Sequence, residues 1–173
     1  AVELGVRIMR YHGAAIVLGA GLLLAGRQLG AQSPAGPSLI APAELVALQQ
    51  RTPVSVVDVR QGWSSYLQNH IADAAWLNVE TLRSGSGALP FQLLPARHYV
   101  ELFARLGIGR DRPVVVYSAG DQSDIDGTFV VWLIHAMGHA DVRLLDGGFA
   151  RWQLEGRPVT QRYPRLGPGR PLA

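Results

Sequence analysis

Short apolar segments that alternate with helix-like segments are the feature that most constrains the fold of this chain. The segment PVVVY (residues 113–117) is apolar at successive positions, as expected of a strand with both faces buried. Further strand-like segments are VSVVDV (54–59), AAWLN (74–78) and VRLLD (142–146). Because helical patterns separate these strands, the sequence predicts a three-layer α/β domain, in which a parallel sheet carries helices on both faces.

Five segments have the pattern of helices, and several of them begin near a Pro or end at a Gly. They are residues 40–50, 63–70, 95–108, 127–138 and 148–156. Asp126 lies directly before the fourth segment, where an acidic side chain is a favourable N-cap, so we expect it to cap that helix. Residues 79–94 contain several Gly and Ser residues and are expected to be irregular.

The charge distribution argues against nucleic acid as a partner. All 16 basic residues are Arg, and the whole chain has a net charge of +3. Between Ser38 and Gly156, however, nine Arg residues face twelve acidic residues, so the basic excess lies in the two ends of the chain. A basic binding patch on the folded part is therefore not expected. The chain also contains no Cys, which excludes disulfides, thiolate metal sites and a cysteine nucleophile.

Residues 1–31 differ in composition from the rest of the chain. Residues 1–8 precede Met9, and Arg10 is followed by an apolar run that Gly residues interrupt. A membrane span needs about 20 apolar residues, whereas a short run with a positive start and small residues at its end is typical of a secretory signal peptide. We therefore expect upstream residues plus a signal peptide, cleaved near Ala31, and a periplasmic or secreted protein. A membrane anchor is the alternative, and contact with a membrane is expected only through this segment.

The remainder divides into three parts by composition. Residues 32–37 are Pro-, Gly- and Ser-rich and are expected to be a linker. Residues 38–160 carry the alternating strand and helix patterns and are expected to form the folded domain. Residues 161–173 are rich in Pro, Gly and Arg and are expected to be a tail or an interdomain linker.

The loop that follows the strand at 113–117 could carry chemistry. It lies where open α/β folds place their sites, at the carboxyl edge of the sheet. Asp58 and Arg60, which end the strand at 54–59, are expected at the same edge, and a structural ion pair is the preferred interpretation of these two residues. The candidate loop residues are Ser118, Ala119, Gly120, Asp121, Gln122, Ser123 and Asp124.

Two specific chemistries match this loop poorly. In a calcium-binding loop register that uses Asp124 and Asp126, the first position is Gln122 and the twelfth is Leu133 instead of Glu. No metal site is therefore predicted. A serine hydrolase would use Ser118 or Ser123, and neither lies in a G-x-S-x-G motif, so a Ser–His–Asp triad could arise only from the tertiary geometry.

Several motifs together resemble the rhodanese family of sulfurtransferases. They are VVDVR (56–60), NHIADAAWLN (69–78), VVVY with its loop and helix, and LLDGGFARWQLEGRPV (144–159). The segment LDGGFARW is similar to the family's C-terminal signature, whereas NHIADA departs from the family's Gly-His-Ile-Pro-Gly-Ala. The resemblance covers residues 38–158 and implies a rhodanese-like fold. Trp132, Phe149 and Trp152 are then expected to make core or interdomain contacts.

The resemblance also implies a position for the catalytic Cys, which this chain does not fill. In the family a Cys that carries the transferred sulfur follows the VVVY strand, and here that residue is Ser118. The family's loop usually holds a basic residue, whereas this one holds Asp121, Asp124 and Asp126. Carboxylates raise the pKa of a nearby anionic nucleophile. The cell-cycle phosphatases that share this kind of fold need a loop Cys and an Arg, so that activity is excluded as well.

The longer, Cys-free loop resembles the N-terminal, non-catalytic domain of tandem thiosulfate or 3-mercaptopyruvate sulfurtransferases. This resemblance implies a structural half whose partner is a Cys-bearing rhodanese domain, in the same chain or in another, with no cofactor and no nucleic acid. The alternative is a stand-alone module that binds a small anion or a protein with the loop from Ser118 to Gly127. A third possibility is an enzyme that uses Ser118 or a bound cation.

Overall fold

The computed structural model describes residues 36–86, 89–120, 124–167, 169, 170 and 172. The expected upstream residues, the signal peptide and most of the expected linker lie outside the described residues, as do Asp121, Gln122 and Ser123 of the loop. No helix among the described residues is both long enough and apolar enough to cross a membrane.

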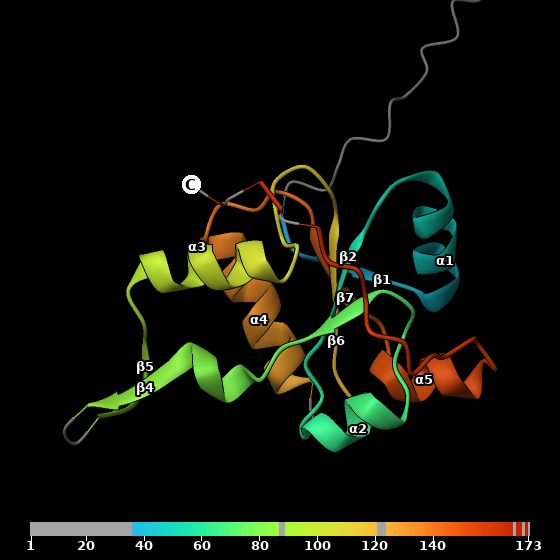
Figure 1. Cartoon of the computed structure of the whole chain (residues 1–173), viewed down its shortest axis with the longest axis horizontal. Helices are drawn as coiled ribbons and strands as arrows, with labels where there is room; N and C mark the ends of the chain where they lie inside the picture. The colour runs from blue at the N-terminus through green and yellow to red at the C-terminus, as the bar shows by residue number, and fades with distance from the viewer. Residues whose placement is uncertain (1–35, 87–88, 121–123, 168, 171, 173) are drawn as a thin grey trace, which may run out of the picture. The chain divides into compact units, whose positions relative to one another are not determined.

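A five-stranded sheet forms the centre of the domain (Figure 1). The strand order is β1-β7-β6-β2-β3, and every neighbouring pair is parallel. The middle strand, β6, is buried along its whole length, as its uninterrupted apolar sequence predicts. The strands are β1 (Ser38–Ile40), β2 (Ser55–Asp58), β3 (Ala74–Trp76), β6 (Val114–Tyr117) and β7 (Val142–Leu145).

Helices cover both faces of this sheet and complete the predicted three-layer α/β fold. Helices α3 and α4 lie on one face, and α1 and α5 lie on the other (Figure 1). Strand β6 supplies both cores, because Val114 and Val116 pack toward α3 and α4 while Val115 packs toward α1 and α5. The helices are α1 (Pro42–Arg51), α2 (Trp63–Gln68), α3 (Ala96–Arg105), α4 (Ile125–Ala136) and α5 (Gly148–Leu154).

Two stretches of regular structure were not predicted. Residues 38–40 form β1, an edge strand that pairs with β7. The stretch 79–94, expected to be irregular, contains a 3₁₀ helix (Val79–Leu82) and the antiparallel hairpin of β4 (Arg83–Ser86) and β5 (Leu89–Leu93). Both strand pairs depend on neighbours in space. Strand β1 is too short to show a pattern, and the Gly and Ser residues that precede β5 obscure the alternation of Leu89, Phe91 and Leu93.

Helix α4 begins two residues before the predicted start. Asp124 occupies its N-cap position, and Asp126 lies in the first turn, so the prediction that Asp126 caps this helix is wrong. An acidic residue in the first turn still interacts favourably with the positive end of the helix. The earlier start brings the first turn of α4 close to the end of β6.

The segment that follows α5 runs back along the domain. Thr160 and His70 exchange two backbone hydrogen bonds of 2.9 Å. The buried His70 ring has Nδ1 2.9 Å from the carbonyl oxygen of Tyr66 and Nε2 2.9 Å from that of Arg162. Further on, Leu172 is buried in the core on the α3 and α4 side. The described part of this Pro-, Gly- and Arg-rich segment is therefore held against the domain.

Candidate functional site

The carboxyl ends of β2 and β6 bring the candidate residues together. Asp58 lies opposite Tyr117 in the parallel register, and the Val59 N–H donates a 3.0 Å hydrogen bond to the Tyr117 carbonyl oxygen. The chain therefore leaves both strands at the same edge, as predicted. A cleft of about 490 Å³ lies there. Its lining includes Arg60, Gln61, Ser118, Asp126, Phe149 and Gln153.

Ser118 is the first residue after β6 and is 3% exposed. Its hydroxyl donates a short hydrogen bond to the carboxylate of Asp124, the N-cap residue of α4. The side chain thus joins the end of the strand to the start of the helix across the loop. A hydroxyl engaged in this way acts as a structural donor.

Backbone contacts with the beginning of α5 hold the first half of the loop in place. The Phe149 N–H donates to the Ser118 carbonyl oxygen at 2.9 Å, and the Ala150 N–H donates to that of Ala119 at 2.8 Å. Gly120 has a φ of +80°, and a Cβ there would lie 2.0 Å from the Gly147 carbonyl oxygen. Only Gly can occupy this position without moving the backbone. Residues 147–150 therefore fix the first half of the loop.

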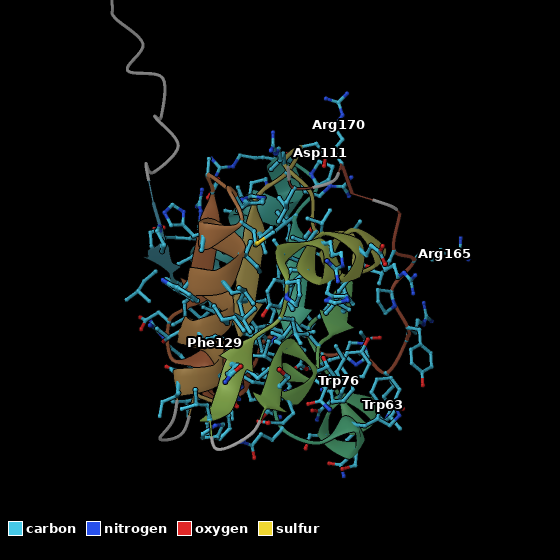
Figure 2. The ribbon with its side chains drawn as sticks, turned by 90° about the vertical axis from the view of Figure 1, so that its left-hand side faces the viewer. Trp63, Trp76, Asp111, Phe129, Arg165 and Arg170 are labelled. Carbon is cyan, nitrogen blue, oxygen red and sulfur yellow. The ribbon has the colours of Figure 1, made fainter. Side chains whose placement is uncertain are left out.

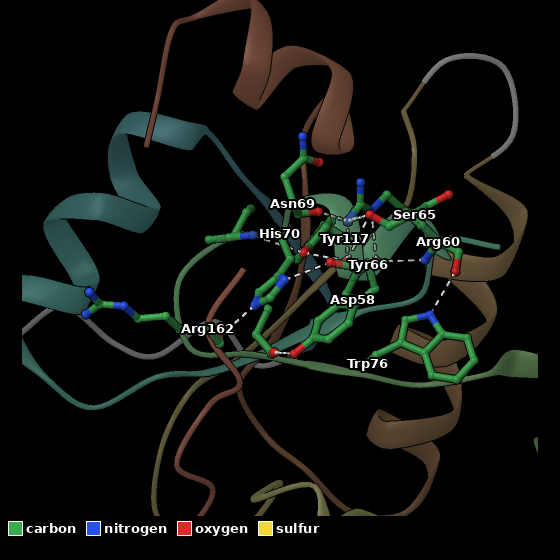
Figure 3. A network of polar contacts seen from close by, with 11 residues as sticks. Asp58, Arg60, Ser65, Tyr66, Asn69, His70, Trp76, Tyr117 and Arg162 are labelled. Atoms are coloured by element: carbon green, nitrogen blue, oxygen red, sulfur yellow. Dashed lines mark hydrogen bonds and ion pairs between the residues drawn. The ribbon is translucent and has the colours of Figure 1, made fainter. Parts of the chain in front are cut away.

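Asp58 and Arg60 form the ion pair that the sequence analysis favoured (Figure 3). Arg60 Nη2 lies 2.7 Å from Asp58 Oδ2, and the two side chains are 8% and 0% exposed. The Tyr117 hydroxyl donates a 2.7 Å hydrogen bond to the same carboxylate oxygen. Arg60 Nη2 also donates to the Asn69 carbonyl oxygen at 2.6 Å, and the guanidinium lies 3.8 Å from the centre of the Phe149 ring. This network ties β2, α2, β6 and α5 together.

The network keeps its two tyrosines neutral. Burial raises the pKa of the Tyr117 hydroxyl far above its usual range, and the Asp58 carboxylate adds to that effect. Burial raises the pKa of Tyr66 to about 12, again with a contribution from Asp58. Both hydroxyls act as hydrogen-bond donors, Tyr117 to Asp58 and Tyr66 to the Ala74 carbonyl oxygen. Neither tyrosine is prepared to act as a base.

The free charge at the mouth of the cleft is negative. The positive charge of Arg60 is compensated by Asp58. Asp126 forms a long ion pair of 3.8 Å with Arg83, which also pairs with Glu80 at 2.9 Å, and it accepts a 3.4 Å hydrogen bond from Gln61 Nε2. With Asp124 nearby on Ser118, the described part of the loop favours cations and donor groups over small anions.

The structure brings no histidine to Ser118. None lines the cleft among the residues that the structure describes. His135 lies on α4 with Nδ1 3.1 Å from the His139 carbonyl oxygen, and His139 Nε2 faces the carbonyl oxygens of Gly109 and Arg112. A Ser–His–Asp triad is therefore not formed by the described residues. Within the same part of the chain, no group of three or more His, Cys, Asp and Glu side chains is arranged to hold a metal ion.

Several contributors to the site have no local sequence signal. Gln61 and Gln153 line the cleft, Asn69 contributes only its carbonyl group, and the Trp76 indole N–H donates to the Arg60 carbonyl oxygen at 3.1 Å. Their roles depend on where β3, α2 and α5 lie in space. Phe149 was expected in a core or interdomain contact, and it is buried beneath Arg60.

Comparisons with known proteins agree with this architecture. Residues 41–155 match the model of the rhodanese-like domain. The chain is 35% identical over 103 residues to thiosulfate sulfurtransferase from Gallus gallus, covering 60% of this chain and 35% of that one. It is 30% identical over 135 residues to a putative thiosulfate sulfurtransferase from Synechococcus elongatus, covering 78% and 42%. The match thus spans less than half the length of these curated relatives.

A solved structure has the same fold. The 3-mercaptopyruvate sulfotransferase SseA from Escherichia coli superimposes with a TM-score of 0.70 at 22% identity, covering 78% of this chain and 54% of that one. The family model matches well over half of the sequence and coincides with the observed three-layer domain. The chain therefore belongs to the rhodanese-like domain family.

Proposed function

We propose that this chain is a non-catalytic rhodanese-like domain that acts together with a Cys-bearing sulfurtransferase domain, in the same polypeptide or in a separate one. The observation that carries the proposal is Ser118, which follows β6 and donates its hydroxyl hydrogen to Asp124. Sulfur transfer through a persulfide needs a thiolate that can hold a second sulfur atom, and a hydroxyl offers no equivalent. No Cys is present elsewhere in the sequence to replace it.

The electrostatics of the loop support the same conclusion. A sulfur-carrying thiolate is stabilised by backbone N–H groups and by basic side chains. Here Asp124 contacts the residue in the nucleophile position, and Asp126 lies at the cleft. Charge repulsion from these carboxylates would destabilise a thiolate next to them. The same repulsion would oppose the binding of an anion such as thiosulfate. Both the residue in the nucleophile position and the charges around it are therefore unsuited to sulfur transfer.

The relatives support a role beside a second domain. The chicken and cyanobacterial proteins are named as a thiosulfate sulfurtransferase and a putative one, and this chain matches 35% and 42% of their lengths. The remainder of each relative leaves room for another domain of similar size. We infer that such a domain supplies the Cys and that the chain described here supports it structurally.

The alternative of a stand-alone module for small anions is not favoured. The cation that lines the cleft, Arg60, is already paired with Asp58 and bonded to the Asn69 carbonyl group. An incoming anion would compete with a buried carboxylate and would meet Asp124 and Asp126. Binding of a protein through this edge remains compatible with the geometry and is part of the proposal.

The test is a sulfur-transfer assay on the full chain. Wild type, Ser118→Cys and Ser118→Ala are given thiosulfate and cyanide, and thiocyanate is measured. We expect no transfer above the uncatalysed rate from any of the three, because the Ser118→Cys thiol still faces Asp124. Circular dichroism confirms that each variant is folded.

Two outcomes contradict the proposal in different ways. Transfer by the wild type that Ser118→Ala abolishes would make the chain an enzyme in its own right. Transfer by Ser118→Cys at the rate of catalytic family members would refute the electrostatic account of the loop, while leaving the wild type inactive.

A further inference from the structure

An exposed apolar surface adjoins the cleft on the α4 side. Ile125 and Trp132 on α4 are 72% and 49% exposed, and Phe91 on β5 is 65% exposed. Phe129, labelled in Figure 2, lies between them and stacks on Trp132 with ring centres 6.2 Å apart. We call these four residues, with Arg83, the docking surface. Contiguous exposed aromatic groups on a soluble domain mark sites of interaction.

Arg83 joins the two halves of this docking surface. Its guanidinium lies 5.0 Å from the centre of the Phe91 ring and 5.2 Å from that of the Phe129 ring. The same guanidinium pairs with Glu80 at 2.9 Å and lies 3.8 Å from Asp126. The hairpin and α4 are therefore linked through one cation, and the docking surface is continuous with the mouth of the cleft.

The hairpin presents its apolar side chains outward. Leu89, Phe91 and Leu93 are alternate residues of β5 and so share one face of the strand. An apolar face is normally buried, yet all three side chains are at least 49% exposed. Phe91 has a φ of +59°, which is rare for a bulky side chain. A two-stranded hairpin is marginally stable on its own in water and gains stability when another surface covers it. The exposed apolar side chains on this marginal hairpin point to an apolar partner at this place.

The charges beside the docking surface select the kind of partner. Glu80 and Asp126 both pair with Arg83, and Asp124 accepts the hydrogen bond of Ser118, so three carboxylates lie beside a single guanidinium charge and the rim is net negative. A second copy of this chain would bring the same acids against each other. A domain that stabilises a thiolate and an anionic sulfur donor carries basic groups around its Cys. Such a domain complements the acidic rim, because opposite potentials favour association.

We propose that the docking surface binds the Cys-bearing sulfurtransferase domain, with the aromatic side chains as the apolar centre of the contact and the acidic residues at its rim. This inference rests on the function proposed above and specifies where the partner sits. Interfaces of this kind combine an aromatic centre with a polar rim. Trp132 is the expected energetic centre, because a partly exposed Trp buried on association contributes strongly to binding.

The experiment is site-directed photo-cross-linking of the full chain in cells of the source organism. A benzophenone-bearing phenylalanine analogue is placed at Trp132, at Gln61 by the cleft, or at Leu154 on α5. Leu154 is 88% exposed and lies on the opposite face of the sheet, so it is the matched control. We expect the Trp132 position to yield a cross-link to a domain with a rhodanese-type Cys loop, identified by mass spectrometry, and the Leu154 position to yield none. With that domain purified, Trp132→Ser should weaken binding by about 30-fold, and Leu154→Ser by less than about twofold.

The other outcomes separate the two proposals. If the Trp132 position cross-links to a second copy of this chain, to residues 1–35, to an unrelated protein or to nothing, the docking surface is wrong. If the Gln61 position still captures the Cys-bearing domain in that case, the proposed function stands and only the surface fails. If neither position captures it, both proposals fail.

Discussion

Replacing Arg60 by Met tests whether the buried ion pair organises the site. In this variant Asp58, which is fully buried, loses its cationic partner, and the Asn69 carbonyl group loses a 2.6 Å hydrogen bond. Breaking a buried pair by removing one partner typically costs about 3–5 kcal/mol, because the remaining charge is uncompensated. Met keeps much of the apolar contact with Phe149. We expect the free energy of unfolding to fall by about 3–5 kcal/mol, out of the roughly 5–15 kcal/mol typical of a domain.

The assay is urea unfolding followed by tryptophan fluorescence, with an exposed ion pair as the control. Arg151→Met removes the partner of Asp146 and Glu155, whose side chains are 48% and 30% exposed, and should cost at most about 1 kcal/mol. The double variant Arg60→Met with Asp58→Asn should recover part of the loss, because it removes the orphaned charge. If Arg60→Met costs no more than Arg151→Met, the reasoning about the buried pair is refuted.

Three further changes test other parts of the structure. The thiol of a Ser118→Cys variant should have a pKa above that of free Cys, and a second change, Asp124→Asn, should lower it; the pH dependence of iodoacetamide alkylation measures both. Because the pKa of Tyr66 is raised to about 12 in the folded state, its stabilising contribution is complete below the unfolded value of about 10 and is lost as the pH rises toward 12. The free energy of unfolding should fall there by about 1.4 kcal/mol per pH unit for this residue. Tyr117, whose pKa is also raised, adds its own slope, so Tyr66→Phe should lower the total slope in alkaline urea titrations by about 1.4 kcal/mol per pH unit. His70→Ala should lower the free energy of unfolding by about 2–4 kcal/mol and speed tryptic cleavage of the segment after α5. The control His98→Ala, at an exposed residue, should change neither quantity. If His70→Ala and the wild type are cleaved at equal rates, His70 does not attach the segment after α5 to the domain.

The fold class and the place of the candidate site can be predicted from the sequence alone. Uninterrupted apolar segments such as 113–117, separated by helical patterns, indicate a parallel sheet, because strands buried on both faces are apolar at successive positions. The order of strands and helices then places Asp58, Arg60 and Ser118 at one carboxyl edge, where the structure has them. The absence of Cys from the chain is likewise a property of the sequence alone.

The short strands and the exposed side chains depend on tertiary contacts and could not be predicted from the sequence. Strand β1 has only three residues and forms because it pairs with the edge of β7. Strands β4 and β5 are likewise short, and each has the other as its hydrogen-bonding partner. Trp152 is buried and Trp132 is half exposed, although both lie on helices, because packing depends on which helix face meets the sheet. Leu172 joins the core from a segment whose composition is typical of a linker. Contacts between residues far apart in the sequence leave no local pattern, so the hydrogen bonds of Tyr117 to Asp58 and of Arg60 to the Asn69 carbonyl group became apparent only in three dimensions.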